Sequence, residues 1–448
     1  MAHAKQKIAT SSRLTAALLL TCVAAQAGEI ASEPRDNGTD LRNDTTEDGD
    51  SRSAEVAVAA EQLVEAVAGH ESVGPLAEAV EAAAGANRAL ELLGVEIPPG
   101  TVQRLSWSAT ELFEGVPVST PVLVVNGARP GPTLCLTAAV HGDELNGIEI
   151  VRRVMHDIAP DNLSGAIIGV PIVNVQGFRR GSRYLPDRRD LNRYFPGNPK
   201  GSAAARIAHS FFTNVAAHCD ALIDLHTGSL ERANLPQIRA DLRNPDVVTL
   251  AQGLGSMVIL HSTPAVGTLR HAVTQAGIPA VTLEAGGPSQ LELAEVKRGV
   301  KGVETLISSL GMLKKRRRWS DPEPVYYRSS WVRANSGGIL LADVRLGSSV
   351  KKGDLLGTIT DPMSNARREL RSPYAGRVIG MARNQVVMPG DAAFHVGIQT
   401  DPVPSQAAEQ IPLDATEGLP AVAQQGVTGS PHDEEPSDGY VDGMSEEE

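Results

Sequence analysis

Short apolar runs alternate with helical stretches between about Ile97 and Gly311. The apolar runs include "TPVLVVNG", "PTLCLTAAV", "GAIIGVPIVN", "CDALIDLH" and "IPAVTLEAGG", and "NGIEIVRRVMHDI" has helical spacing. Continuous apolar strands are typical of a sheet covered on both faces. Their alternation with helices predicts an α/β domain over residues 96–316, in which a sheet is flanked by helices.

A different pattern follows over residues 321–400. In "VRANSGGILLADVRLGSSVKKGDLLGTITDP" and "RSPYAGRVIGMARNQVVMPGDAAFHVG", short apolar segments are separated by Gly and Asp turns. This pattern predicts a small all-β barrel-sandwich domain. Its two halves resemble biotinyl or lipoyl carrier domains, but the expected hairpin tip, "DPMSNARREL", has no lysine to modify. We therefore interpret the domain as a structural or access-limiting module.

The N-terminus has the features of a secretory leader. Three basic residues precede an apolar run that ends in Ala25-Gln26-Ala27, which fits a small-x-small cleavage site, so residues 1–27 are predicted to be a signal peptide. The apolar run is shorter than the roughly 20 residues that span a bilayer. We expect an exported, periplasmic or extracellular protein without a membrane span. An uncleaved helix and lipidation of Cys22 are the alternatives.

The flanking segments have biased compositions. Residues 28–95 are first acidic and polar, which predicts disorder, and then rich in alanine with helical spacing, which predicts one or two helices. Residues 401–448 contain 12 acidic residues and no Lys or Arg, so this predicted disordered tail accounts for the formal net charge of −12. The basic run Lys314–Trp319 is interpreted as a solvated linker, and nothing favours a nucleic-acid partner.

Two cysteines, Cys135 and Cys219, would remain after cleavage of the leader. With only two cysteines there is no disulfide framework, and their spacing does not resemble a zinc site. Both are predicted to be buried apolar residues without a disulfide.

Polar residues that suit metal binding follow the predicted strands. His141 and Glu144 follow one strand, His226 ends another, and Glu284 ends a third. Ligands of α/β sheets collect at the carboxyl ends of strands. Two histidines and one glutamate with a fourth position open are typical of catalytic zinc. Alternatively, Asp143 and Glu144 could cap the following helix, and His226 could only hydrogen-bond within a loop.

The segment "GFRRGSRYLPDRRDLNRYFPGN" contains six arginines within fifteen residues. Guanidinium groups bind carboxylates in a bidentate manner, so this density indicates recognition of an anion. Arg193 is expected to be desolvated, and Asn192 beside it supplies a neutral donor. The alternative is an exposed loop in which the arginines pair with Asp187 and Asp190.

Four motifs in the order "HGDE", "RY…DLNR", "DLHTG" and "LEAGG" resemble those of the succinylglutamate desuccinylase/aspartoacylase family, within the zinc carboxypeptidase-like hydrolases. The resemblance covers residues 97–312 and implies a mixed sheet flanked by helices, with one Zn²⁺ per chain. It implies the following residue roles: zinc ligands His141, Glu144 and His226, catalytic Glu284 and Arg183, and substrate-binding Asn192 and Arg193.

The resemblance also places Asp190 behind the metal site, without contact to the ion. The sequence departs from the aspartoacylase pattern, because two extra residues lie between Arg183 and Arg193. Arg188 and Arg189 therefore remain alternatives to Arg183 as the arginine that stabilises the oxyanion.

These roles predict a zinc-dependent hydrolase of an N-acyl amino acid or a related small amide. Zinc would polarise the amide carbonyl, Glu284 would accept a proton from water, and Asn192 with Arg193 would hold the substrate's carboxylate. A zinc carboxypeptidase acting on short peptides is one alternative, which a β domain that caps the cleft would disfavour. A non-catalytic binding protein is the other, and it predicts no metal. The oligomeric state stays open.

Overall fold

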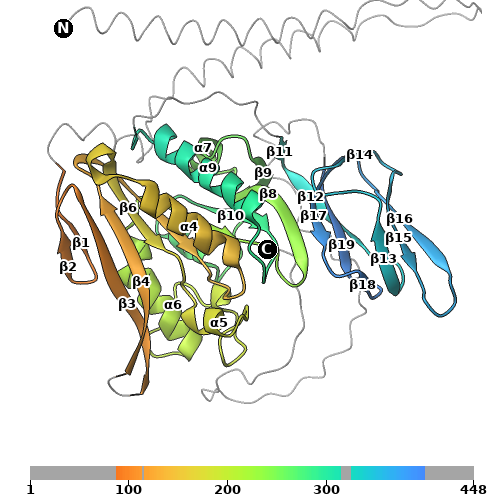
Figure 1. Cartoon of the computed structure of the whole chain (residues 1–448), viewed down its shortest axis with the longest axis horizontal. Coiled ribbons are helices and arrows are strands. Elements are labelled where there is room, and N and C mark those ends of the chain that lie inside the picture. Colours follow the sequence, from red (N-terminus) through yellow and green to blue (C-terminus); the bar gives the residue numbers. More distant parts are fainter. Residues whose placement is uncertain (1–86, 114–115, 314–323, 399–448) are drawn as a thin grey trace, which may run out of the picture. The chain divides into compact units, whose positions relative to one another are not determined.

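A computed structural model of the chain describes residues 87–113, 116–313 and 324–398 (Figure 1). The predicted leader, the acidic part of residues 28–95, most of their Ala-rich part, the basic linker and the acidic tail lie outside the described residues. None of the described helices has the length and apolar character needed to cross a bilayer.

The α/β domain is built on a mixed sheet, as predicted. β6, β5, β7 and β10 are parallel neighbours, while β4 and β8 run antiparallel beside β6 and β10. The strands of this domain are β3 (Thr101–Phe113), β4 (Val116–Asn126), β5 (Arg129–Ala138), β6 (Ser164–Val170), β7 (Ala221–His226), β8 (Arg232–Ala240), β9 (Val258–His261) and β10 (Ala280–Gly286).

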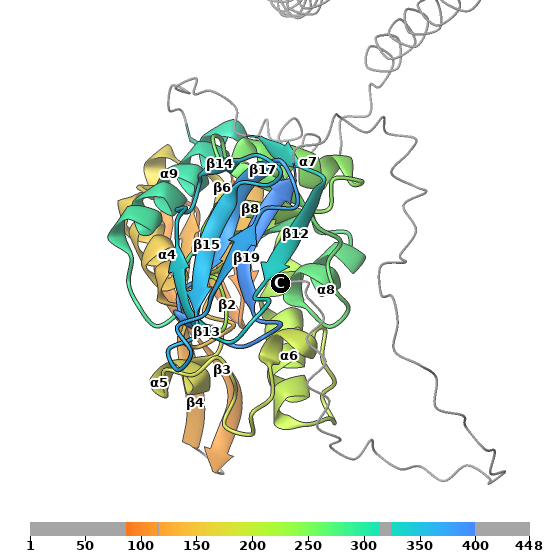
Figure 2. The same cartoon turned by 90° about the vertical axis from the view of Figure 1, so that its right-hand side faces the viewer.

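Helices cover both faces of this sheet, which explains the continuous apolar strands. On one face α4, α7 and α9 share a core with Leu134 and Leu136, and on the other α6 and α8 pack with Cys135 and Ile168. Figures 1 and 2 show these two layers. The helices are α4 (Leu145–Asp157), α5 (Val175–Arg179), α6 (Ala203–Asn214), α7 (Pro245–Gly253), α8 (Leu269–Gln275) and α9 (Leu293–Ser309), with short 3-10 helices η1 (Pro160–Asn162), η2 (Leu191–Arg193) and η3 (Ala216–His218).

The end of the segment predicted to be helical is instead a β-hairpin. β1 (Leu90–Leu92) pairs with β2 (Val95–Ile97) through a two-residue turn, in which Leu93 and Gly94 both have positive φ. Such turns match the twist of a hairpin. Leu92 and Ile97 are buried in the core beside Trp107, so tertiary packing overrides the helical preference of Leu90, Glu91 and Leu92.

Cys135 and Cys219 form a disulfide, which corrects the prediction that they stay unpaired. Both are buried, as expected. Their Cα atoms are 5.8 Å apart, because Cys135 lies on β5 and Cys219 directly precedes β7, the neighbouring parallel strand. Their sequence separation of 84 positions hid this proximity.

Residues 325–398 form short strands only, as the Gly and Asp turns predicted. They are β11 (Val325–Tyr326), β12 (Arg328–Arg333), β13 (Gly338–Ala342), β14 (Ser349–Val350), β15 (Leu355–Thr360), β16 (Arg367–Arg371), β17 (Gly376–Ala382), β18 (Val386–Val387) and β19 (Ala392–Ile398). A four-stranded sheet in the order β16-β15-β13-β18 shares a core with β17 and β19.

The sheet of the α/β domain continues into the β domain. β17 pairs antiparallel with β8, so the sheet continues in the order β12-β19-β17-β8-β10. Figure 1 shows these strands side by side. The β domain therefore pairs with β8, and β8 is the neighbour of β10, the strand that carries Glu284.

Candidate active site

His141, Glu144 and His226 converge at the carboxyl ends of β5 and β7. The Nδ1 atoms of His141 and His226 lie 2.8 and 2.9 Å from the two carboxylate oxygens of Glu144. One ligand atom from each residue lies within 4.8 Å of the others, and all three residues are buried. Glu144 precedes α4 but makes no capping hydrogen bond with its side chain, so the capping alternative is wrong for this residue.

A carboxylate contacts the far nitrogen of each histidine. Asp224 lies 2.8 Å from Nε2 of His226, and Asp190 lies 3.1 Å from Nε2 of His141. Carboxylates in this position fix the orientation of metal-ligating imidazoles. Asp224 is itself held by the hydroxyl of Thr137, which donates to it at 2.7 Å. Two oriented imidazoles and one carboxylate are a donor set that suits Zn²⁺.

The electrostatics of this cluster also favour a cation. Burial and Arg183 lower the pKa of His141, but Glu144 and Asp190 outweigh them and raise it to about 9. Burial raises the pKa of Glu144, yet His141 and His226 lower it well below its usual range. The carboxylates thus draw protons onto the histidines. A metal ion would replace these protons, since zinc ligands must be neutral histidines and ionised carboxylates.

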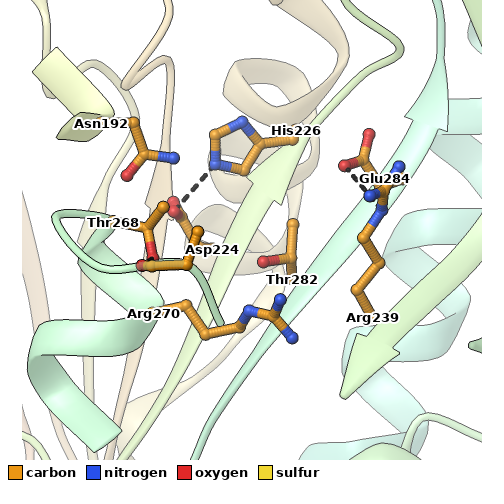
Figure 3. A pocket seen from close by; sticks show the side chains of 9 residues that line it. Asn192, Asp224, His226, Arg239, Thr268, Arg270, Thr282 and Glu284 are labelled. Atoms are coloured by element: carbon orange, nitrogen blue, oxygen red, sulfur yellow. Dashed lines mark hydrogen bonds and ion pairs between the residues drawn. The ribbon is translucent and has the colours of Figure 1, made fainter. Parts of the chain in front are cut away.

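Glu284 lies beside the cluster because β10 and β7 are parallel neighbours with Glu284 opposite His226. Its side chain is buried, with one oxygen accepting from Asn234 at 3.0 Å and the other 3.3 Å from Nε of Arg239. Burial raises the pKa of Glu284, while Arg239 and His226 limit the rise. Figure 3 shows Arg239 beside this carboxylate.

A pocket that is open to solvent lies beside the cluster and contacts both His226 and Glu284. The pocket is lined by Asn192, Asp224, His226, Arg239, Ala265, Thr268, Arg270, Thr282 and Glu284. Figure 3 shows polar side chains from separate strands and from the start of α8 facing this space.

The arginine-rich segment contributes one arginine to the cluster. Nη1 of Arg183 lies 3.2 Å from His141 and 3.4 Å from Glu144, and its Nη2 donates to Asp190 at 2.9 Å. Arg183 is buried, whereas Arg188 is exposed and Arg189 pairs with Asp187. The geometry therefore favours Arg183 over these two alternatives.

Asn192 and Arg193 are separated by the turn that holds them. Asp190 caps η2 by accepting from the backbone N–H of Asn192. Asn192 is buried in the pocket wall, where its Oδ1 accepts from the N–H of Leu269 at 2.8 Å. Arg193 is exposed, which corrects the expectation that it is desolvated. A tight turn directs successive side chains apart, which the adjacent letters could not show.

The structure adds Arg239, Arg270, Thr282 and Asn234 to the site residues found by motif. A period-two pattern could have indicated Thr282, because it lies two positions before Glu284 on β10 and so faces the same side. No such signal exists for Arg270, which lies in α8 and reaches the pocket only through the tertiary fold.

The site combines an α/β sheet, a buried His-Glu-His cluster that could hold a metal ion, and an adjacent buried glutamate. Residues 130–310 match the family model of the succinylglutamate desuccinylase/aspartoacylase catalytic domain. The resemblance drawn from the four motifs is confirmed by this match.

Two curated relatives indicate the chemistry of the family. The chain is 27% identical over 261 residues to the N-alpha-acetyl-L-2,4-diaminobutyric acid deacetylase of Halomonas elongata, covering 54% of this chain and 75% of the relative. It is 32% identical over 203 residues to the succinylglutamate desuccinylase of Paraburkholderia xenovorans, covering 41% of this chain. That match spans 56% of the desuccinylase, little more than half its length. Both relatives are deacylases by name.

Solved structures share the fold over most of the described residues. A succinylglutamate desuccinylase from Silicibacter sp. TM1040 superimposes with a TM-score of 0.60 at 25% identity, covering 70% of this chain and 99% of the other. The product-bound ectoine utilization protein EutE (DoeB) from Ruegeria pomeroyi gives a TM-score of 0.61 at 26% identity, with the same coverage. The mixed sheet flanked by helices is thus the fold of this family.

Proposed function

We propose that the protein is a zinc-dependent deacylase that hydrolyses the amide bond of an N-acyl amino acid or a related small amide bearing a carboxylate. The observation that carries this proposal is the buried His141, Glu144 and His226 cluster, next to a pocket that contains Glu284. The deacylase relatives support it.

His141, Glu144 and His226 would hold one Zn²⁺ per chain. When bound, zinc supplies Lewis acidity to the acyl carbonyl and to water. Asp224 and Asp190 keep the two imidazoles oriented, because each carboxylate contacts the nitrogen that faces away from Glu144.

Glu284 acts as general base and then as general acid. It accepts a proton from the attacking water and passes it to the departing amine. Its raised pKa suits both steps, since a carboxylate of low pKa would be a weak base. The buried guanidinium of Arg183 stabilises the negative charge that develops on the carbonyl oxygen.

We assign the substrate's carboxylate to Asn192 and Arg193, with Arg270 as a further cation. Asn192 and Arg270 both line the pocket (Figure 3). Arg193 follows Asn192 on the solvent side, where it can attract the anion toward the pocket.

Export is also a proposal. It is supported by the predicted leader at residues 1–27 and by the Cys135–Cys219 disulfide, because disulfides persist mainly in oxidising compartments. Locating the protein in periplasmic and cytoplasmic fractions would test this.

A hydrolysis screen tests the activity directly. The zinc-loaded mature protein would be incubated with N-acyl amino acids and, in parallel, with short peptides. We expect release of the free amino acid from at least one N-acyl amino acid. Faster cleavage of peptides would favour the carboxypeptidase alternative. A protein without bound zinc and without hydrolysis would match the binding-protein alternative and contradict the proposal.

A further inference from the structure

A cross-strand row of side chains connects the β domain to the site. Trp331 on β12 pairs with His395 on β19, which pairs with Gly380 on β17, which pairs with Asn234 on β8. Residues directly opposite each other in a sheet present their side chains on the same face. The row therefore ends at Asn234, whose Nδ2 donates to Glu284 at 3.0 Å.

Asn234 is buried, and its amide holds one of the two oxygens of Glu284. The other oxygen faces Nε of Arg239 at 3.3 Å. A carboxylate held at both oxygens keeps one orientation. Because a general base must lie within hydrogen-bond reach of the proton it accepts, this orientation matters for catalysis.

Gly380 leaves the space that Asn234 occupies. A Cβ at position 380 would lie 2.9 Å from Oδ1 of Asn234, 3.0 Å from Cβ of His395 and 3.3 Å from Cη2 of Trp331. The space between Gly380 and the Asn234 amide therefore has no room for a side chain, and a single methyl group at Gly380 would displace the amide or its neighbours.

The two rings behind Gly380 are themselves fixed. Trp331 and His395 stack with their centroids 4.6 Å apart and their planes at 9°, and the guanidinium of Arg232 lies 5.2 Å from the centre of the Trp331 ring. Burial, together with Arg239 and Arg232, lowers the pKa of His395 to about 3, so its ring is neutral. His395 is buried and Trp331 is half-buried, so this stacked pair has little freedom to yield.

We propose that Gly380 of the β domain is a positioning residue: because it has no side chain, it leaves the Asn234 amide in the place from which it orients the Glu284 carboxylate. This inference rests on the proposed role of Glu284. It assigns the β domain a part in the chemical step, in addition to its packing.

A double-mutant cycle between Gly380 and Asn234 tests this contact. In the full-length zinc-loaded enzyme, Asn234→Ala should lower kcat about 10- to 100-fold with KM within about threefold, since a hydrogen bond to a charged group is lost. Gly380→Ala should lower kcat about tenfold or more, because the added methyl group displaces the Asn234 amide. In the double variant kcat should fall no further than in Asn234→Ala alone, because the atom that the methyl group meets is gone.

Gly337→Ala is the matched control, because a Cβ there would lie 3.6 Å or more from its neighbours. It should leave kcat and KM unchanged. A second variant, Asn234→Asp, keeps the shape of the side chain but removes the N–H group that donates to Glu284. It should lower kcat as Asn234→Ala does.

The wild type, Asn234→Ala, Gly380→Ala and the double variant would also be compared by urea unfolding, which needs no substrate. Coupling between the two positions in both kcat and unfolding free energy supports the inference. If the two substitutions are coupled in unfolding free energy but their effects on kcat are additive, the contact is purely structural and the inference is overturned. Additive effects on both kcat and unfolding free energy would overturn it as well. If the wild type binds no zinc and hydrolyses nothing, the proposed function fails, and the positioning role fails with it, while the unfolding cycle still reports whether the contact exists.

Discussion

At the scale of single residues, the site separates metal binding from proton transfer. His141, Glu144 and His226 form one cluster, and Glu284 lies beside it with partners of its own. The motifs predicted these four positions because each lies at the end of an apolar strand. The side-chain direction of Arg193 could not be predicted, since it depends on the turn of η2.

Glu284→Gln should separate catalysis from folding. Gln keeps the shape but removes the proton acceptor, and a positioned general base contributes about 10²- to 10⁴-fold. We expect kcat to fall by at least about 10²-fold, with zinc content and melting temperature near wild type. Kinetics, elemental analysis and thermal unfolding on one preparation would check this. Near-normal kcat with full zinc would remove Glu284 from the mechanism.

His226→Ala should abolish stoichiometric zinc binding, because one of three protein ligands is lost. Asp224→Asn should have a smaller effect, weakening zinc affinity about 10- to 100-fold through loss of the carboxylate behind His226. Elemental analysis and chelator competition would measure both variants. Full metal content in His226→Ala would show that the ligand assignment is wrong.

Substrates without a free carboxylate should be poor. The methyl ester of a good N-acyl amino acid should have a kcat/KM at least about tenfold lower than that of the acid, since the charge-assisted contacts with the arginines are lost. Comparing the acid and its ester under identical conditions would check this. Equal turnover of the two would contradict the assigned roles of Asn192 and Arg193.

At the scale of elements, strands buried on both faces were predicted well because their apolar runs are continuous. The β1–β2 hairpin was missed because its strands have three residues each and follow an Ala-rich segment. The disulfide and the pairing of β17 with β8 were missed for another reason: both join segments far apart in the chain, and no local pattern encodes such contacts.

The Cys135–Cys219 disulfide should stabilise the pairing of β5 and β7. Replacing both cysteines with alanine should lower the free energy of unfolding by about 2–5 kcal/mol, the usual cost of removing a native disulfide. Urea unfolding would measure the loss. A thiol assay on the denatured wild type provides the control, and full reactivity of both cysteines without reductant would contradict the disulfide.

At the scale of the whole molecule, charge and chemistry reside in different segments. The 12 acidic residues at 401–448 equal the formal net charge of −12, so a chain ending at residue 400 would carry a formal net charge of zero. None of the site residues lies in this tail. The tail therefore affects solubility more than catalysis, since proteins near zero net charge associate more readily.

Deleting residues 401–448 should leave kcat and KM unchanged while lowering solubility at low ionic strength. Kinetics and light scattering on the truncated and full-length proteins would check both expectations. A loss of kcat in soluble, zinc-loaded truncated protein would give the tail a role that the site does not explain.

The pairing of β17 with β8 has a consequence for how the molecule comes apart. Backbone hydrogen bonds cross from one folded region into the other, so opening the β domain exposes an edge of the sheet that carries Glu284. The two regions should then share a cooperative unit, in which amide protons of β8 and β17 exchange with solvent through the same opening. Selection on the active site would thereby act on β-domain residues that never meet the substrate.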